Sequence, residues 1–310
     1  MNKNKHKSLI FIPYAELPGA GSGANISNNA DRQSIYLKNC CVALISAKRN
    51  NECDVALVTN IDVPETYKAL LIKNGILIIK YDFDVFLFSD DYKWKLAFYK
   101  MCALYHVVHD LEYDYYSYLD TDVFIQGSFD NVWEECEHNI LLYDINDGLQ
   151  VENYRIFLSE IRDFRGENSF VTHYGGEFFA AKRENAFAFI QKCLETYREM
   201  VSMDFRTTRG DEFIASIAAF DLKCTIKNAG AYIYRFWTGA GFRCISTRYM
   251  YNPIVVLHVP DEKARGLITV YDKYISKNKF PDNKTVYRIF RLKKTPFWET
   301  VKKYIKGRKK

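Results

Sequence analysis

Residues 113–127 of the chain read YDYYSYLDTDVFIQG. An aromatic and apolar run over 115–119 ends abruptly in Asp120-Thr121-Asp122, and apolar residues resume at 123–125. The pattern predicts a buried strand that ends at two carboxylates. Because an unpaired carboxylate is costly to bury, this placement indicates a divalent cation. Oxygen ligands on a tight turn suit Mg²⁺ or Mn²⁺, ions that commonly bind diphosphates. A surface turn capped by two aspartates is the alternative.

The chain before this stretch alternates predicted strands with predicted helices. Strands are expected at 8–14, 54–59 and 76–80, and helices are expected to begin at Asp31 and Pro64. The third strand leads into an acidic turn at 81–84. An apolar helix over 94–108, with Lys95 and Lys100 as its unpaired charges, then runs directly into the aromatic stretch. This βαβαβ order predicts an α/β fold with a parallel, nucleotide-binding sheet.

The end of the first predicted strand is the expected place for a ligand. In sheets of this kind, nucleotides bind beyond the carboxyl ends of the strands. Tyr14 is the last residue of that strand, and the glycine-rich loop 19–30 follows it. We therefore assign both to the binding region, with a plain surface loop as the alternative for 19–30.

Three polar patterns follow in the second half of the chain. His173-Tyr174-Gly175-Gly176-Glu177 predicts a glycine turn entering an apolar strand, where the backbone can approach a ligand closely. Asp211 and Glu212 stand together at the start of a predicted helix, where capping accounts for only one acid. His258 ends the apolar run 254–258. The alternatives are a hairpin turn for 173–177, a helix cap for Asp211 and Glu212, and a structural role for His258.

Composition narrows the class of protein. The 310 residues are 48% hydrophobic and 26% charged, values typical of a soluble globular protein, with a high aromatic share of 16%. The net charge of +5 is unevenly distributed, because residues 284–310 carry eleven Lys and Arg against the single acid Glu299. The rest of the chain is mildly acidic. This division argues against a nucleic-acid-binding body and for a tail with its own electrostatic role.

Cysteine spacing and the N-terminus bear on the compartment. The eight cysteines form no C-x-x-C pair and lie mostly among apolar residues, which predicts reduced thiols in an intracellular protein. The N-terminus is basic and then apolar, but its apolar run is too short for a signal peptide. The sequence has no run of about 18 apolar residues, the length that a membrane span needs. A cytoplasmic protein is therefore expected.

Taken in order, these patterns resemble the GT-A glycosyltransferases, which transfer a sugar from a nucleotide diphosphate donor. Two subgroups of retaining enzymes are the most similar. The glycogenin and lipooligosaccharide-galactosyltransferase type has a basic residue in the helix before Asp-x-Asp and a late His that completes the metal site. The blood-group transferase type has a Tyr-Gly-Gly-x-Phe-Phe-Gly strand, a long helix and then Asp-Glu-Ser, to which residues 174–180 and 211–213 are similar. The resemblance covers about residues 8–260.

The resemblance implies a role for each matching residue. Asp120 and Asp122 bind Mn²⁺ or Mg²⁺, with His258 as the third ligand. Donor contacts come from Asp120, Lys100, Tyr14 and Lys263. Glu212, with Asp211 beside it, stabilises or attacks the anomeric carbon. The donor-sugar or acceptor pocket is lined by His173, Tyr174, Gly175, Gly176 and Glu177.

The chain also departs from both patterns. Ala180 replaces the final glycine of the strand, and no Lys-Pro-Trp follows the late His. Lys263, Arg265 and Gly266 are the candidates for phosphate contacts in its place. The residues also suit this chemistry apart from the resemblance. A cation stabilises the charge on a departing diphosphate, and a nearby carboxylate serves as base or nucleophile. The resemblance favours retention of the anomeric configuration.

These expectations define a domain organisation. Residues 1–283 form the GT-A domain, with a nucleotide-sugar-binding half (1–127) and an acceptor-binding half (128–283). Residues 284–310 form a basic amphipathic tail that associates with anionic lipid at the cytoplasmic face of a membrane; a disordered basic tail is the alternative. The expected reaction moves a hexose or N-acetylhexosamine from a nucleotide-sugar, most commonly a UDP-sugar, to a glycan or lipid-linked glycan. Lipopolysaccharide, capsule or similar surface polysaccharide synthesis is the expected setting.

Two other classes of function are carried forward. A nucleotidyltransferase acting on sugar phosphates is also α/β with paired aspartates, but it would require a basic, glycine-rich signature directly after the first strand. The loop 19–30 contains no Lys or Arg. A non-catalytic carbohydrate- or membrane-binding protein that keeps the same fold is the third class.

Overall fold

A computed structural model describes residues 6–17, 26, 31–89, 91–146, 151–166, 170–222, 224–239 and 254–292. Within these residues a seven-stranded mixed sheet, ordered β3-β2-β1-β4-β7-β6-β8, forms the centre of the fold. Its strands are β1 Ser8–Tyr14, β2 Asp54–Thr59, β3 Leu77–Lys80, β4 Tyr115–Leu119, β6 Asn139–Asp144, β7 Tyr174–Lys182 and β8 Thr225–Asn228. Strands β1 to β4 pair in parallel, whereas β7 runs antiparallel to β4 and β6. This is an α/β architecture compatible with a Rossmann-like fold.

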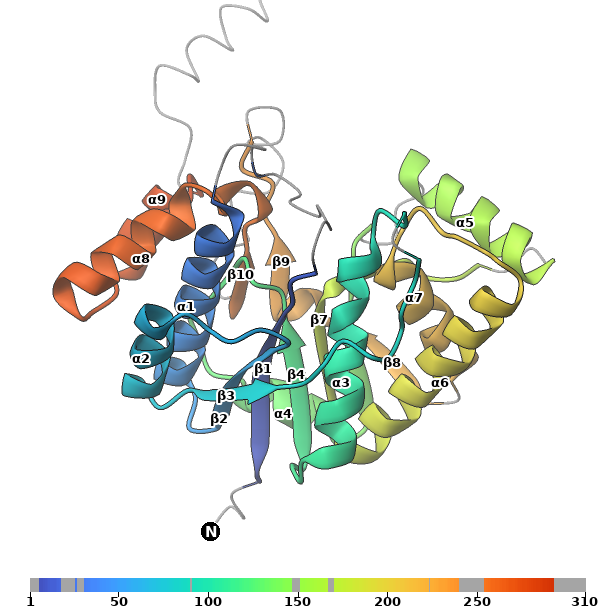
Figure 1. Ribbon diagram of the computed structural model, residues 1–310, viewed down its shortest axis with the longest axis horizontal. Coiled ribbons are helices and arrows are strands. Elements are labelled where there is room, and N and C mark those ends of the chain that lie inside the picture. The colour runs from blue at the N-terminus through green and yellow to red at the C-terminus, as the bar shows by residue number, and fades with distance from the viewer. Residues whose placement is uncertain are drawn as a thin grey trace, which may run out of the picture.

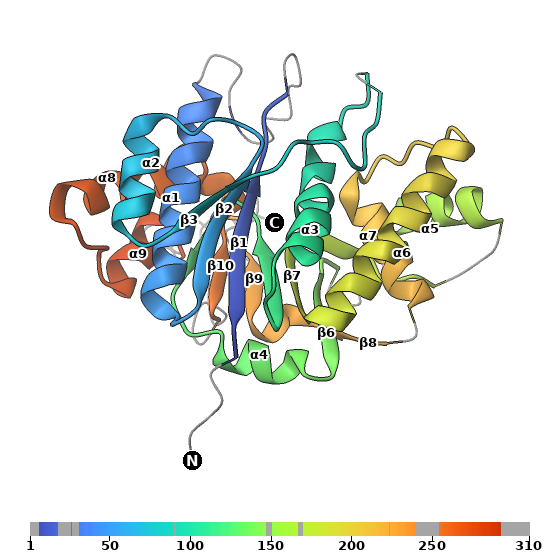
Figure 2. The same cartoon turned by 60° about the horizontal axis from the view of Figure 1, so that its bottom comes forward.

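Helices cover both faces of this sheet, because the central strands are apolar on both sides. All seven residues of β1 are buried; Ile10 and Ile12 pack in one core cluster, and Leu9 and Phe11 pack in the other. The first face carries α1 Arg32–Asn50, α2 Glu65–Lys73 and α8 Gly266–Lys277; the second carries α3 Tyr99–Asp110, α5 Glu152–Arg165, α6 Arg183–Ser202 and α7 Asp211–Asp221 (Figure 1). The short α4, Asp130–Cys136, lies near the amino end of β1 (Figure 2).

A second, three-stranded sheet of order β5-β10-β9 lies beside the first. It consists of β5 Val123–Ile125, β9 Ile233–Arg235 and β10 Val256–His258. Only Asp120-Thr121-Asp122 separates β4 of the large sheet from β5 of the small one. The two carboxylates therefore lie where the chain leaves one sheet and enters the other.

Most predicted strands and helices are confirmed, and three differ. The helix expected over 94–108 begins as a 3₁₀ turn, Lys95–Phe98, before α3. The helix α5 was not expected, because its sequence is strongly polar. It buries only three residues, Phe157, Ile161 and Phe164. The predicted glycine turn at 175–176 is wrong, because both glycines lie inside β7.

The C-terminal segment packs on the domain further than residue 283. Helix α9, Asn283–Ile289, follows α8, and both Phe290 and Leu292 are fully buried in the first core cluster. The amphipathic helix predicted from Pro296 onward lies outside the described residues. No helix in the described ranges has both the length and the apolar character needed to cross a bilayer.

Candidate functional site

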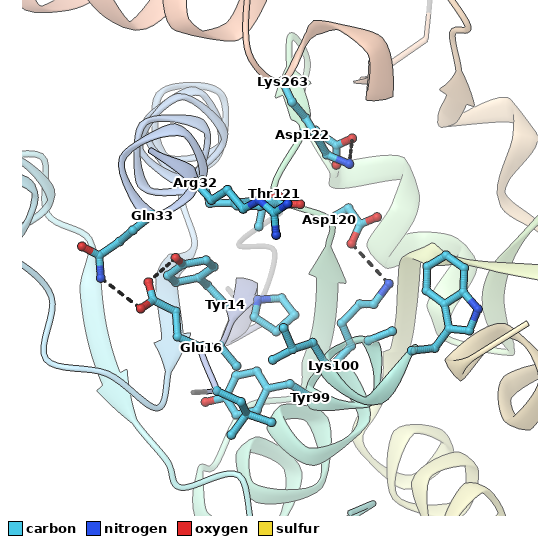
Figure 3. Close-up of a pocket in the computed structure, with 17 residues that line it drawn as sticks. Tyr14, Glu16, Arg32, Gln33, Tyr99, Lys100, Asp120, Thr121, Asp122 and Lys263 are labelled. Atoms are coloured by element: carbon cyan, nitrogen blue, oxygen red, sulfur yellow. Dashed lines mark hydrogen bonds and ion pairs between the residues drawn. The ribbon is translucent and has the colours of Figure 1, made fainter. Parts of the chain in front are cut away.

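A cavity of about 380 Å³ opens at the carboxyl ends of β1 and β4 (Figure 3). The described residues that line it are Pro13, Tyr14, Ala15, Glu16, Leu17, Arg32, Gln33, Tyr36, Trp94, Leu96, Ala97, Tyr99, Lys100, Asp120, Thr121, Asp122 and Lys263. All four residues predicted to contact a donor are among them. Parallel α/β sheets bind ligands at this edge, so the cavity is in the place that the sequence predicts.

Three potential metal ligands meet beside the cavity. One ligand atom from each of Asp120, Asp122 and His258 lies within 4.8 Å of the others. His258 Nε2 is 3.3 Å from Asp122 Oδ2 and 3.9 Å from Asp120 Oδ2. The small sheet produces this meeting, because β10 pairs with β5 in a register that sets His258 opposite Val123, the residue after Asp122.

The donor set fits a divalent cation. Both carboxylate oxygens of Asp122 are buried and neither accepts a well-formed hydrogen bond from a described residue. Lys263 Nζ is 3.1 Å from Asp122 Oδ2 (Figure 3). Burial alone raises the pKa of Asp122, but the charges of Lys263 and His258 lower it far below its ordinary value. Two carboxylates and an imidazole are therefore a donor set that could hold a divalent cation such as Mg²⁺ or Mn²⁺.

His258 is held for this role by a second carboxylate behind it. Its Nδ1 lies 3.4 Å from Oε1 of Glu177, which is completely buried. Burial lowers the pKa of His258, whereas Asp122 and Glu177 raise it, to about 9 overall. The imidazole therefore keeps its proton at neutral pH, and a cation held at Nε2 would take the place of that proton. A carboxylate on the far nitrogen is the usual way in which proteins orient a metal-binding histidine.

Lys100 connects the metal ligands to the acidic pair on α7. Its Nζ lies 3.3 Å from Asp120 Oδ1 and 3.0 Å from Asp211 Oδ2, and it donates a hydrogen bond of 3.0 Å to the carbonyl oxygen of Gly176. The expectation that Lys100 is an unpaired charge is therefore wrong. A Cβ on Gly176 would lie 2.2 Å from Asp211 Oδ2 and 2.7 Å from Lys100 Nζ. Glycine is required inside β7 because these two side chains occupy that space.

Asp211 is the more deeply buried of the two acids. Burial raises its pKa, Lys100 lowers it and Glu212 raises it again, to about 6 overall. Its ordinary value in an unfolded chain is 3.8. The folded protein therefore holds a proton on Asp211 that the unfolded chain releases, so stability contributed by this group is lost as pH rises from about 4 to about 6.

We expect Asp211→Asn to remove this pH dependence. The amide cannot ionise, so the advantage of the variant over wild type in free energy of unfolding should grow by about 1.4 kcal/mol between pH 5 and pH 8. Urea unfolding of both proteins at the two pH values measures the difference. Asp221→Asn, at the exposed end of the same helix, is the matched control. A difference between wild type and Asp211→Asn that is the same at both pH values would contradict the assignment.

Glu212 lies in a different environment from its neighbour. Its Oε2 is 3.1 Å from His173 Nε2, and its Oε1 is 3.4 Å from an Arg235 terminal nitrogen. Burial raises the pKa of Glu212, but the hydrogen bond from His173 and the charge of Arg235 lower it below its ordinary value overall. With 23% of its side chain exposed against 7% for Asp211, Glu212 is the more accessible member of the pair, and it has the lower pKa.

Arg235 is the site residue that the sequence analysis missed. It donates hydrogen bonds of 2.6 and 2.7 Å to the two oxygens of Glu177, in a bidentate pair. Glu177 thus contacts both His258 and Arg235, and Arg235 contacts Glu212. Arg235 is the last residue of β9, so the alternating pattern YIYR was its only sequence signal, and that pattern does not specify a partner on β7.

The stretch 173–177 does not line the cavity in the described residues. His173 and Glu177 are buried, and Tyr174 donates its backbone N–H to Ser216 Oγ at 2.9 Å. These residues instead hold the metal ligands, Lys100 and the acidic pair in one network. Their predicted place in a sugar or acceptor pocket stays a prediction.

Removing Arg235 should be strongly destabilising. Arg235→Ala leaves the fully buried carboxylate of Glu177 without its bidentate partner, and breaking a buried pair in this way costs about 3–5 kcal/mol in free energy of unfolding. Chemical denaturation measures the loss. The double variant Arg235→Ala/Glu177→Gln should recover part of it, because the orphaned charge is gone. A single variant within about 0.5 kcal/mol of wild type would show that the pair does not stabilise the fold.

Comparison with known proteins adds no family to this description: no protein-family model matches the chain, and no curated protein matches it significantly. The functional argument therefore depends on the geometry of the site. That geometry brings together two bridged groups. Lys100 joins Asp120 to Asp211, and Glu177 with Arg235 joins His258 to Glu212.

Proposed function

We propose that this protein is a metal-dependent glycosyltransferase of the GT-A fold. The reaction moves a hexose or N-acetylhexosamine from a nucleotide-sugar, with UDP as the expected nucleotide, to a glycan or lipid-linked glycan. One observation carries the proposal. Two carboxylates and an imidazole converge beside a lysine-lined cavity at the carboxyl ends of parallel strands, with a second acidic pair bridged to them. Cation ligands together with basic side chains are a common way to bind the phosphates of a nucleotide.

The cavity residues suit the parts of such a donor. Asp120, Asp122 and His258 would hold Mn²⁺ or Mg²⁺, which would stabilise the charge that develops on a departing diphosphate. Lys100 and Lys263, on opposite sides of the two aspartates, hold the phosphates by charge (Figure 3). Tyr14 and Tyr36, whose rings are 6.0 Å apart, offer aromatic surface to the base or ribose.

Glu212 is the group proposed to act at the anomeric carbon. Arg235 and His173 keep it ionised, so it can form a bond to that carbon, or stabilise positive charge there, while the bond to the diphosphate oxygen breaks. The acceptor hydroxyl then bonds to the same carbon, the carboxylate of Glu212 leaves, and the hydroxyl proton passes to the neighbouring carboxylate of Asp211. Two displacements on one centre give retention of configuration. Asp211, whose pKa is raised, lies beside Glu212 on α7 and is the group proposed to take up this proton.

Donor hydrolysis tests the proposal. Purified protein is incubated with Mn²⁺ and a panel of UDP-, GDP- and CMP-sugars, with and without EDTA. Slow hydrolysis of one donor, abolished by EDTA and releasing the nucleotide of that donor, supports a transferase and names the sugar. Release of pyrophosphate from a sugar phosphate and a nucleoside triphosphate would favour a nucleotidyltransferase. No turnover and no metal-dependent donor binding would favour a binding protein.

We also propose that the basic C-terminal segment attracts the protein to the anionic cytoplasmic face of a membrane. Its charge supports this, since anionic lipid attracts Lys and Arg by about 1 kcal/mol each. Because Phe290 and Leu292 are buried in the core, the test is a truncation after Leu292, which leaves that packing intact. Wild type should sediment with phosphatidylglycerol vesicles at low salt, and the truncated chain should not. Equal sedimentation of both would contradict the proposal.

A further inference from the structure

A second group of metal-ligating side chains lies outside the site described above, where the acidic turn after β3 meets α3. Asp84, Cys102 and His106 each offer a ligand atom, and the three atoms lie within 4.8 Å of one another. Cys102 and His106 are four residues apart on α3, a spacing that places both on one face of a helix. The sequence analysis assigned no role to the turn that contributes Asp84.

We propose that Asp84, Cys102 and His106 form a zinc site. A thiolate, an imidazole and a carboxylate are the ligand types that Zn²⁺ selects, whereas Mg²⁺ and Mn²⁺ prefer oxygen. With one thiolate and one carboxylate, the protein ligands neutralise the ion. Three protein ligands leave the fourth tetrahedral position to water. The inference does not depend on the proposed transferase activity.

The distances are close to those of a tetrahedral site. His106 Nε2 is 2.7 Å from Asp84 Oδ1, and Cys102 Sγ is 3.6 Å from the same oxygen. Ligand atoms around tetrahedral zinc are about 3.3–3.6 Å apart, so the contact between Cys102 and Asp84 already has this length, and the pair formed by His106 and Asp84 has to open. Asp84 has 56% of its side chain exposed and can make this movement by rotating about its own bonds.

The surroundings of His106 orient its imidazole for metal binding. Its other nitrogen, Nδ1, lies 3.8 Å from Asp110 Oδ2, and its ring stacks on Tyr81 with centroids 4.8 Å apart. A carboxylate behind the imidazole favours the tautomer whose Nε2 lone pair is free for a metal. The stacked ring limits rotation about the side-chain bonds.

Cys102 closes the inner side of the cluster. Cys102 is fully buried, and its thiol donates hydrogen bonds to Asp84 Oδ1 and to the carbonyl oxygen of Asp82, the latter at 3.5 Å. In the metal-free protein this thiol keeps its proton, which it donates to these two oxygens. Zinc binding replaces that proton, which leaves to solvent, and the S–H bond gives way to a Zn–S bond. The bound ion fastens the turn after β3 to the helix that carries Lys100.

Cobalt absorption tests this site directly. Co²⁺ is titrated into the metal-free, full-length protein, and the thiolate-to-cobalt charge-transfer band is recorded. We expect one equivalent of Co²⁺ to produce the band and Zn²⁺ to abolish it. Cys102→Ser and Asp84→Asn should each lose it, and Asp110→Asn should weaken Co²⁺ binding by about tenfold. Asp84 is exposed, so its variant keeps the fold and the thiol.

Two controls separate this site from others. Cys224→Ser removes a partly exposed thiol beside β8, at the opposite edge of the sheet from β3, and should keep the band. Asp122→Asn/His258→Ala should also keep it, because the first metal cluster contains no sulfur. Co²⁺ binding without a thiolate band, or a band that survives Cys102→Ser, would overturn the proposal whether or not the protein hydrolyses a nucleotide-sugar.

Discussion

Replacing Asp122 with asparagine is expected to lower Mn²⁺-dependent donor turnover by about a thousandfold. The side chain is buried, and its carboxylate lies between Lys263 and His258. Asparagine has nearly the same shape but no charge, so the two cationic groups lose the anion that they share. The affinity for Mn²⁺ should fall together with turnover, and calorimetric titration with Mn²⁺ measures it separately from donor hydrolysis.

The control for this variant is Asp130→Asn, which changes an exposed aspartate in the first turn of α4. Its turnover should equal that of wild type. Thermal unfolding of both variants checks that any loss of turnover is not a loss of fold. If a folded Asp122→Asn protein keeps wild-type turnover, the metal cluster is not part of the catalytic site.

Replacing Glu212 with glutamine should lower kcat by about a thousandfold while leaving donor and Mn²⁺ affinity almost unchanged. Glutamine keeps the hydrogen bond to His173 and loses only the charge that faces Arg235. Glu212 is not among the residues that line the nucleotide cavity in the described part of the chain, so the sugar of the donor would extend beyond that cavity to reach it, and affinity set by the nucleotide should survive. Steady-state kinetics with the donor identified by the hydrolysis panel separates kcat from KM.

Glu199→Gln is the matched control, since Glu199 pairs with Arg165 on the outer helices and contacts none of the site residues named above. An unchanged kcat in the Glu212→Gln protein would point to Asp211 as the acting carboxylate. A higher KM with an unchanged kcat would make Glu212 a donor-binding group and contradict its proposed role.

The sequence predicts the parallel half of the fold well because that half is defined by local signals. Apolar runs such as 8–14 and 54–59 are buried on both faces, and side-chain or proline caps at Asp31 and Pro64 begin the helices after them. The same reasoning located Asp120 and Asp122 at the end of a strand. A buried carboxylate needs a partner, and this requirement is visible without coordinates.

What escaped prediction depends on contacts between distant segments. Gly175 and Gly176 read as a turn, yet a Cβ at Gly175 would lie 1.9 Å from Glu177 Oε2, so the glycines accommodate side chains inside a strand. The role of Arg235 depends on its contact with Glu177, which lies on a different strand, β7. Such pairs join different strands, and neither periodicity nor local spacing specifies which residues will meet.

The position of Asp120-Thr121-Asp122 between the two sheets also bears on how the protein is made. Asp122 and His258 come from parts of the chain far apart in sequence, and they meet only when β10 has paired with β5. During synthesis, the aspartates leave the ribosome long before the histidine. A growing chain therefore cannot bring the three candidate ligands together until β10, the last strand in the described residues, has paired with β5.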